Sequence, residues 1–164
     1  MIVILILGSP SDREFASKIT AALTAYGLSY EIRIASAHKT PAYLLEMLET
    51  YEQDTRHKVF ITVAGRSNAL SGMVDAAVTA PVIACPPYSD KYGGGDLFSS
   101  LRTPSGVAPA VVLEPGNAAL MAAKILGISN VAVREAVIQM QDKQRQRLYE
   151  ADTANNVIKS SRSI

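Results

Sequence analysis

Three short polar segments of this sequence each follow an apolar run that is typical of a buried strand. They are residues 8–12 (GSPSD), 36–41 (SAHKTP) and 64–68 (AGRSN). In an open parallel α/β sheet, ligands bind outside the carboxyl ends of the strands. We therefore expect the three segments to converge on one rim and to form a site for a small polar ligand.

The first segment has the residue types of a phosphate-binding loop. Gly8, Ser9 and Ser11 stand directly before a predicted helix, whose free N–H groups and dipole favour an anion. The segment is neither a P-loop nor a dinucleotide-binding loop, because GxxxxGK and GxGxxG are both absent from it. A structural interpretation is equally good for this loop alone, in which Ser11 or Asp12 simply caps the helix. Asp12 could cap the helix and still reach a ribose hydroxyl.

The second segment contains His38, the strongest candidate for proton transfer. The ordinary pKa of a histidine side chain, about 6.5, lies close to neutral pH, and Lys39 beside it is a candidate phosphate partner. Most single histidines carry no chemistry, and a lone lysine is more often a solvated charge. Their position on the expected rim favours a functional interpretation for both residues. His57 precedes a predicted strand instead, so we assign it a structural role at the opposite end of the sheet.

Other reactive residue types are sparse. Cys85 ends a predicted strand, and because no base remains for it once His38 is assigned, a small buried role is favoured over that of a nucleophile. Arg66 has two open interpretations, an anion ligand or a partner in surface or subunit salt bridges. Residues 86–95, with two prolines and three consecutive glycines, are the expected mobile loop, and the glycines form a lid hinge or a plain turn. Two histidines and one cysteine without metal-ligand spacing predict no metal site.

Hydrophobic periodicity predicts repeated units of a strand followed by a helix. The expected strands are residues 2–7, 30–35, 59–64, 82–85 and 111–113, and the expected helices are residues 15–26, 41–51, 69–78 and 117–126. Residues 30–35 alternate apolar and charged side chains, which predicts a strand near a sheet edge. The expected buried stripe of the second helix is Leu44, Leu45, Leu48 and Tyr51, and Asn117 is the expected cap of the last helix. This order of elements predicts a parallel sheet with helices on both faces.

Composition predicts a single domain formed by residues 1–164. With 48% hydrophobic residues, the chain can form a sizeable core from residues 1–129, followed by a C-terminal helix and tail at 130–164. We expect that helix outside the core or against a neighbouring subunit, and residues 155–164 to fray. A net charge of +1 without charge blocks argues against nucleic acid or a membrane as partner. The apolar start is too short for a membrane span and one cysteine allows no internal disulfide, so we expect a cytoplasmic protein.

Taken together, five motifs resemble the PurE family, the aminoimidazole ribonucleotide carboxylases and mutases of purine synthesis. The motifs are GSPSD, SAHKTP, AGRSNALSG, SSLRTPSG and NAALMAAKIL, and in this order they span roughly residues 2–126. The resemblance implies a flavodoxin-like three-layer α/β/α sandwich that assembles into homo-octamers. It also implies a nucleotide substrate and a reaction without cofactor or metal.

The resemblance also implies roles for individual residues. His38 matches the family's acid/base histidine, and Asp12 would bind the ribose. The phosphate would be held by Ser9, Ser11, Ser36 and Lys39, with Gly8 beside them in the first loop. Gly65 and Ser67 would line the pocket for the imidazole and the carboxyl group. The expected site therefore has one catalytic residue and eight substrate-binding residues.

Two departures from the mutase pattern favour the second, carboxylase branch of the family. Mutases typically read AGxGGAAHLPG after the third strand, with a second histidine, and SAHRTP after the second strand. Here residues 64–72 contain no histidine, and Lys39 stands in place of the arginine. These features resemble the branch that includes the carboxylase half of the bifunctional animal enzyme and uses CO2 directly. Two alternatives stay open: a mutase with the same fold and product, and a non-enzymatic nucleotide or FMN binding module.

Overall fold

The computed structural model of the chain describes residues 1–155 and has a five-stranded sheet at its centre. The strands are β1 (Ile2–Leu7), β2 (Tyr30–Ile34), β3 (Lys58–Val63), β4 (Val82–Ala84) and β5 (Ala110–Val111). All neighbouring strands are parallel, in the order β2-β1-β3-β4-β5. This is the flavodoxin-like order, and it confirms the predicted parallel sheet with β2 at one edge. The predicted fraying at residues 155–164 falls outside the described part of the chain, apart from Asn155 itself.

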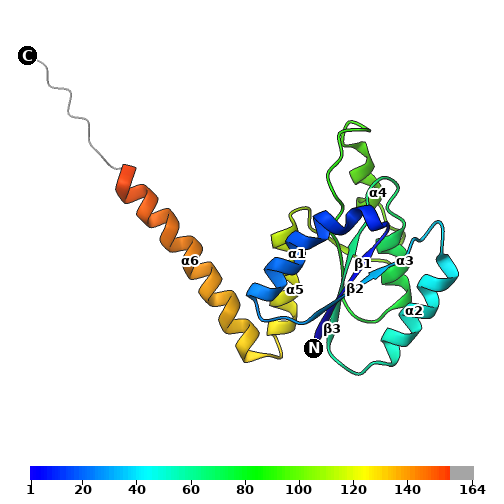
Figure 1. Cartoon of the computed structure of the whole chain (residues 1–164), viewed down its shortest axis with the longest axis horizontal. Coiled ribbons are helices and arrows are strands. Elements are labelled where there is room, and N and C mark those ends of the chain that lie inside the picture. The colour runs from blue at the N-terminus through cyan, green and yellow to red at the C-terminus, as the bar shows by residue number, and fades with distance from the viewer. Residues whose placement is uncertain (156–164) are drawn as a thin grey trace, which may run out of the picture.

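Helices cover both faces of the sheet (Figure 1). They are α1 (Arg13–Ala25), α2 (Pro41–Gln53), α3 (Leu70–Ala77), α4 (Phe98–Leu101), α5 (Pro115–Gly127) and α6 (Val131–Asn155), with two short 3-10 helices, η1 (Pro10–Asp12) and η2 (Gly95–Leu97). Helices α1 and α5 pack on one face, whereas α2 and α3 pack on the other. The predicted three-layer sandwich is therefore confirmed.

The central strand β1 is buried on both faces. Val3, Leu5 and Leu7 pack into the cluster with α1 and α5, while Ile4 and Ile6 pack into the cluster with α2 and α3. All five side chains are completely buried, and each such burial stabilises the fold by about 1.5–3 kcal/mol. A strand covered on both faces has no solvent side, which is why its sequence is continuously apolar.

Two details of the predicted helices are wrong. Leu45 is 44% exposed, and Met47 takes its place in the buried stripe of α2. The reason is helical geometry, because the buried positions lie at i, i+3, i+4 and i+7. Helix α5 begins at Pro115, so Glu114 holds the N-cap position that we expected of Asn117. A proline suits the first helical position, since the N–H that it lacks has no partner there.

The segment between β4 and β5 contains secondary structure that the sequence did not predict. The glycine run forms a turn, with Gly93 and Gly94 at φ of 58° and 74°, and η2 and α4 follow it directly. Positive φ is accessible to glycine at little cost, which explains the residue type. The segment projects beyond the carboxyl end of the sheet (Figure 1).

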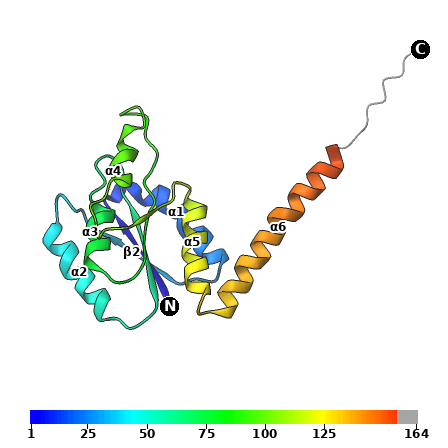
Figure 2. The ribbon, with the colours of Figure 1, turned by 180° about the vertical axis from the view of Figure 1, so that it is seen from behind.

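Helix α6 leaves the sandwich and projects from it (Figure 2). Its first turns pack on the core, because Val133 and Val137 are buried in the cluster with α1 and α5. A Cβ on Gly127 would lie 3.4 Å from the backbone of Arg134, so α5 and α6 approach closely at their junction. Residues 142–154 are exposed, and this distal part lies outside the core. Within residues 1–155, no helix is long and apolar enough to cross a membrane.

The order of the strands reverses between β1 and β3. From β1 the chain continues to β2 on one side, and from β3 it continues to β4 on the other, which leaves a crevice where the loops diverge. Gly8 follows β1, and a Cβ at this position would lie 3.1 Å from the Cβ of Ala64, which follows β3. The missing side chain therefore lets the two loops meet at the mouth of the crevice.

Candidate functional site

The loops after β1, β2 and β3 meet around a cavity of about 570 Å³. All nine residues that the sequence predicted line it: Gly8, Ser9, Ser11, Asp12, Ser36, His38, Lys39, Gly65 and Ser67. The three loops thus converge on one rim. The roles of the individual residues stay predictions.

The loop after β1 is organised by the hydroxyl of Ser9. Its Oγ accepts a hydrogen bond from Ser11 Oγ at 2.8 Å and from the Ser11 N–H at 3.3 Å. Ser9 is thereby the N-cap of η1, whereas the side chain of Asp12 makes no capping bond to α1. Asp12 therefore holds the N-cap position of α1, as one of the two structural interpretations expected, but its carboxylate makes no capping bond and lines the cavity.

The loop after β2 is a closed turn that carries His38. The Thr40 N–H donates to the carbonyl of Ser36 at 2.9 Å, and the Ser36 N–H donates to Thr40 Oγ1 at 3.0 Å. The Lys39 N–H donates to Ser36 Oγ at 3.3 Å. These bonds fix the backbone without engaging the imidazole ring or the ammonium group. Both side chains belong to exposed residues that line the cavity.

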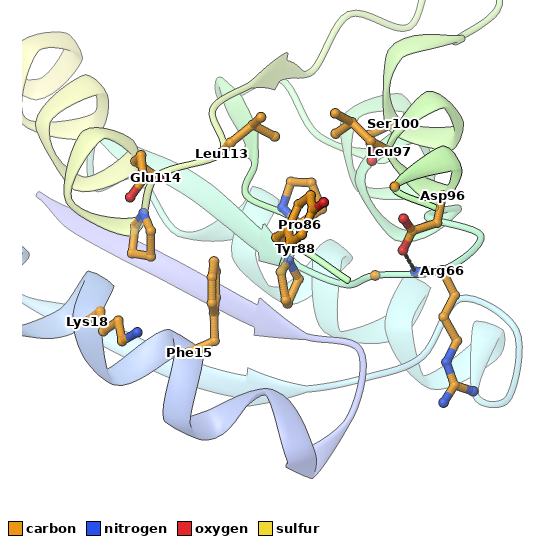
Figure 3. A pocket seen from close by; sticks show the side chains of 14 residues that line it. Phe15, Lys18, Arg66, Pro86, Tyr88, Asp96, Leu97, Ser100, Leu113 and Glu114 are labelled. Carbon is orange, nitrogen blue, oxygen red and sulfur yellow. Dashed lines mark hydrogen bonds between the residues drawn. The ribbon is translucent and has the colours of Figure 1, made fainter. Parts of the chain in front are cut away.

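The loop after β3 contributes Gly65, Arg66 and Ser67. Arg66 has a φ of 59°, an uncommon left-handed conformation for a residue other than glycine. Its backbone N–H donates to Asp96 Oδ2 at 3.2 Å, and its guanidinium is turned away from Asp96 (Figure 3). A Cβ on Gly65 would lie 3.7 Å from the carbonyl oxygen of Pro87, so the segments after β3 and β4 also lie close together.

The surroundings of Asp12 change its ionisation. Burial raises the pKa of its carboxyl above the ordinary value of 3.8, while a backbone hydrogen bond with Ser9 and the positive charge of Arg66 oppose that rise. Arg66 therefore acts electrostatically on the loop after β1. Of the two open interpretations of Arg66, this interaction supports that of an anion ligand at the cavity.

Sequence reasoning missed the residues that the segment after β4 adds to the cavity. They are Pro87, Tyr88, Ser89, Lys91 and Asp96. Most of them lie in the stretch that we expected to be a mobile loop. The available signal was Lys91, an isolated cation between proline and glycine clusters, which joins Lys39 and Arg66 among the cations that line the cavity. A phosphorylated ligand would be attracted by all three.

Cys85 and His57 lie where the sequence predicted. Cys85 is completely buried at the end of β4, with its Sγ 3.7 Å from the carbonyl oxygen of Leu113. Burial, followed by the charge of Glu114, raises the pKa of Cys85 to about 12, so the thiol is unreactive at neutral pH. His57 precedes β3 at the opposite end, where its Nδ1 lies 3.0 Å from Ser129 Oγ. Both residues therefore have structural surroundings.

A second cavity of about 350 Å³ adjoins the first (Figure 3). The two cavities share five residues: Gly65, Arg66, Pro87, Tyr88 and Asp96. On the far side the second cavity is bounded by Phe15 and Lys18 of α1 and by residues 113–115 before α5. Of the nine predicted site residues, only Gly65 lines it, whereas all nine line the first cavity.

A flavodoxin-like sheet with hydroxyls, cations and a histidine around the crevice at its strand reversal defines an α/β protein with its polar cavity where folds of this class bind small ligands. The comparisons with known proteins agree with this class. The sequence matches the AIR carboxylase family over residues 2–147. The chain therefore belongs to the AIR carboxylase, or PurE, family, as the five motifs predicted.

Individual relatives extend this result. The chain is 54% identical over 152 residues to a phosphoribosylaminoimidazole carboxylase of Archaeoglobus fulgidus, which covers 93% of this chain and 83% of that protein. It is 41% identical over 128 residues to the bifunctional phosphoribosylaminoimidazole carboxylase/phosphoribosylaminoimidazole succinocarboxamide synthetase of Mus musculus, which covers 78% of this chain and 30% of that protein. The crystal structure of Treponema denticola PurE matches with a TM-score of 0.93 at 47% identity, covering 94% and 98% of the two chains.

Proposed function

We propose that this chain is a carboxylase that adds CO2 to C4 of 5-aminoimidazole ribonucleotide and yields 4-carboxy-5-aminoimidazole ribonucleotide in purine synthesis. The observation that carries the proposal is the cavity in which hydroxyls, a lysine and one histidine from three loops surround the same space. Relatives named phosphoribosylaminoimidazole carboxylase support it. Membership of the family also favours an enzyme over the alternative of a non-enzymatic nucleotide or FMN binding module.

In this proposal the loops after β1 and β2 bind the nucleotide. Lys39 neutralises the phosphate, and the hydroxyls of Ser9, Ser11 and Ser36 donate hydrogen bonds to its oxygens. A charge-assisted bond of this kind contributes about 1.5–3 kcal/mol. Asp12 accepts a hydrogen bond from the ribose, which places the base toward the loop after β3. The imidazole then lies beside Gly65 and Ser67.

The chemical step needs a nucleophilic carbon, an electrophile and a base. The exocyclic amine of the substrate donates electron density into the ring, so C4 attacks the carbon of CO2. A C–C bond forms while the electron pair of one C–O π bond moves onto its oxygen, so both oxygens of CO2 end up in the new carboxylate. His38 then removes the proton from C4, which restores the aromatic ring, and passes it to water. The substrate supplies its own electron push, so neither a cofactor nor a metal is needed.

The main rival is a mutase, which moves a carboxyl group from the exocyclic nitrogen to C4 within the same fold. Mutases resemble this chain but carry a second histidine in the segment that corresponds to residues 64–72. That segment has no histidine here, although its first four residues line the cavity. Lys39 in place of an arginine is the second difference. Both support CO2 rather than a carbamate as the source of the carboxyl group.

The proposal is tested by turnover. We expect the protein to convert 5-aminoimidazole ribonucleotide and dissolved CO2 into the carboxylated product, at a rate proportional to the enzyme concentration and without ATP. The product is measured by its mass and by its ultraviolet absorbance. If the folded protein forms no product from this substrate with CO2 present, the carboxylase assignment is wrong.

The oligomeric state and the cellular location of the enzyme belong to the same proposal. We assign it a homo-octamer, since the resemblance to the family implies one, and a cytoplasmic location, where nucleotide synthesis and a reduced cysteine are both expected. The substrates are then a small-molecule nucleotide and CO2, with no role for nucleic acid or membrane. The one-domain organisation of residues 1–164 stays a prediction of composition.

A further inference from the structure

One sequence motif, SSLRTPSG at residues 99–106, has no part in the reaction proposed above, yet its first two residues contact the cavity loop after β3. The backbone N–H of Asn68 donates to Ser99 Oγ at 2.9 Å. The side-chain amide of Asn68 donates to Ser100 Oγ at 2.9 Å. These bonds join segments more than thirty residues apart in the chain.

The hydroxyl of Ser99 is the centre of these contacts. Its Oγ also lies 2.9 Å from the carbonyl oxygen of Arg66 and 2.7 Å from that of Asp96. A hydroxyl has two lone pairs that accept and one hydrogen to donate, so Ser99 accepts from the Asn68 N–H and donates to one of the two carbonyls at a time. One side chain thus holds the carbonyl of Arg66 and the N–H of Asn68, on either side of Ser67.

The loop that Ser99 holds needs such support. Arg66 has a φ of 59°, and this left-handed conformation costs an ordinary residue about 1–2 kcal/mol. The Arg66 N–H bonds to Asp96 and its carbonyl lies beside Ser99, so both sides of the strained residue are attached to the α4 segment. Asn68 is 5% exposed, so its amide would be costly to leave without a partner.

We infer that Ser99 is a positioning residue for the proposed carboxylation, which holds residues 65–67 in the geometry that brings the imidazole and CO2 together. Ser99 lines neither cavity, so it acts through the loop and touches no substrate. The inference rests on the proposed function. It adds a determinant of CO2 use that lies outside the substrate-binding loops.

The other two loops do not depend on Ser99. The loop after β1 is closed by the bonds between Ser9 and Ser11, and the loop after β2 by the bonds between Ser36 and Thr40. Loss of the Ser99 hydroxyl should therefore loosen the CO2 side of the cavity and leave the phosphate side intact. A displacement of about 1 Å at a reacting group costs up to roughly a hundredfold in rate.

The test compares Ser99→Ala with Ser99→Thr, which keeps the hydroxyl, and with Ser105→Ala as a matched control in the exposed part of the same motif. Kcat and the KM values for nucleotide and CO2 are measured separately. We expect Ser99→Ala to lower kcat/KM for CO2 by about ten- to a hundredfold, with the nucleotide KM within about twofold. Ser99→Thr should recover most of the loss, and Ser105→Ala should equal the wild type.

Amide hydrogen exchange gives a readout that is independent of turnover. Because the Asn68 N–H donates to Ser99 Oγ, its exchange should accelerate in Ser99→Ala and not in Ser105→Ala. If the alanine variant folds poorly, Ser99→Cys takes its place, because a thiol nearly keeps the volume and weakens the hydrogen bonds. Its Asn68 N–H should then exchange faster than in the wild type, and its kcat/KM for CO2 should be lower. Wild-type kinetics or wild-type exchange in folded Ser99→Ala would overturn the inference and leave the carboxylase standing. If the wild-type protein itself forms no carboxylated product, the proposed function is wrong, and the catalytic part of the inference is wrong with it.

Discussion

His38 lies in a turn that is fixed by its neighbours rather than by its own side chain. The bonds between Ser36 and Thr40 hold the backbone, and the imidazole ring stands at the cavity lined by both other loops. A ring in this position can change its protonation state without breaking the turn. That property suits a group that must accept and release a proton in every cycle.

Replacing His38 separates its chemical role from a binding role. We predict that His38→Asn keeps the fold and the nucleotide affinity but lowers kcat by about two to four orders of magnitude, because an amide can hydrogen-bond but cannot shuttle protons. His57→Asn is the matched control, since His57 lies at the opposite end of the sheet beside Ser129. Near-native turnover of folded His38→Asn would remove this residue from the mechanism.

Asp12 is predicted to reduce stability in its charged form. A carboxyl whose pKa is raised in the fold binds its proton more tightly in the native state, so stability falls as the pH rises through that pKa. Asp12→Asn should therefore unfold at a higher temperature than the wild type at pH 7. The difference should shrink on acidification and vanish well below the ordinary value of 3.8.

Thermal midpoints measured between pH 3 and pH 8, about the range over which a carboxyl with a raised pKa titrates, test this sign. Binding of the nucleotide should weaken in the same variant, since the amide replaces the acceptor proposed for the ribose. A variant that is less stable than wild type at pH 7, or whose advantage grows on acidification, would contradict the prediction.

The cavity residues that directly follow β1, β2 and β3 were predictable from the sequence, whereas those from the segment after β4 were not. His38, Lys39 and the serines of the first loop follow their strands directly, so strand prediction alone locates them on the rim. Tyr88 and Asp96 reach the cavity only because the chain after β4 folds back over it. That return depends on bonds between segments about thirty residues apart, which no local pattern encodes.

At the scale of elements, the buried strands and helices were predicted because their apolar patterns are long. The exceptions are short or depend on a single position. Helix α4 has four residues, too few for a helical period to appear in the sequence. Leu45 was predicted to be buried because leucine is apolar. The helical spacing set by Leu44 and Leu48 instead puts Met47 on the buried face and Leu45 on the exposed one.

A pair of glycines tests how the helices end and begin. Gly27 ends α1 with a φ of 68° and open space around it, so Gly27→Ala adds strain without a clash. We predict a loss of about 1–2 kcal/mol in the free energy of unfolding. Gly116, in the first turn of α5, also has open space but no positive φ, so Gly116→Ala should raise stability by about 0.5–1 kcal/mol. Urea unfolding curves measure both, and equal effects of the two variants would contradict the account.

At the scale of the whole molecule, the fold separates a buried sheet from the edge that carries the cavity. The sheet is buried by two helical layers, and all the loops that line the cavity lie at its carboxyl end. Helix α6 extends away from this body and exposes apolar side chains, with Leu148 at 71% and Tyr149 at 64% exposed. Exposed apolar groups on a projecting helix favour contact with another chain.

The proposed octamer predicts a definite mass. Eight chains of 17.5 kDa give about 140 kDa, and light scattering on the eluted protein at micromolar concentration should report it. Leu148→Glu should shift the mass toward smaller species, because it places a charge on the exposed apolar part of α6. Ala151→Glu on the same helix serves as a charge-matched comparison. A monomer mass for the wild type would contradict the assembly.

The source of the carboxyl group tests the central claim most directly. The rate of carboxylation of 5-aminoimidazole ribonucleotide is followed from mixing with bicarbonate alone, with and without carbonic anhydrase. A carboxylase that consumes CO2 predicts a faster early phase when carbonic anhydrase is present, and a rate that saturates with dissolved CO2. The opposite result would be efficient conversion of the freshly made carbamate while CO2 is continuously removed, with no dependence on CO2 in the first assay. That result would contradict the carboxylase and identify a mutase.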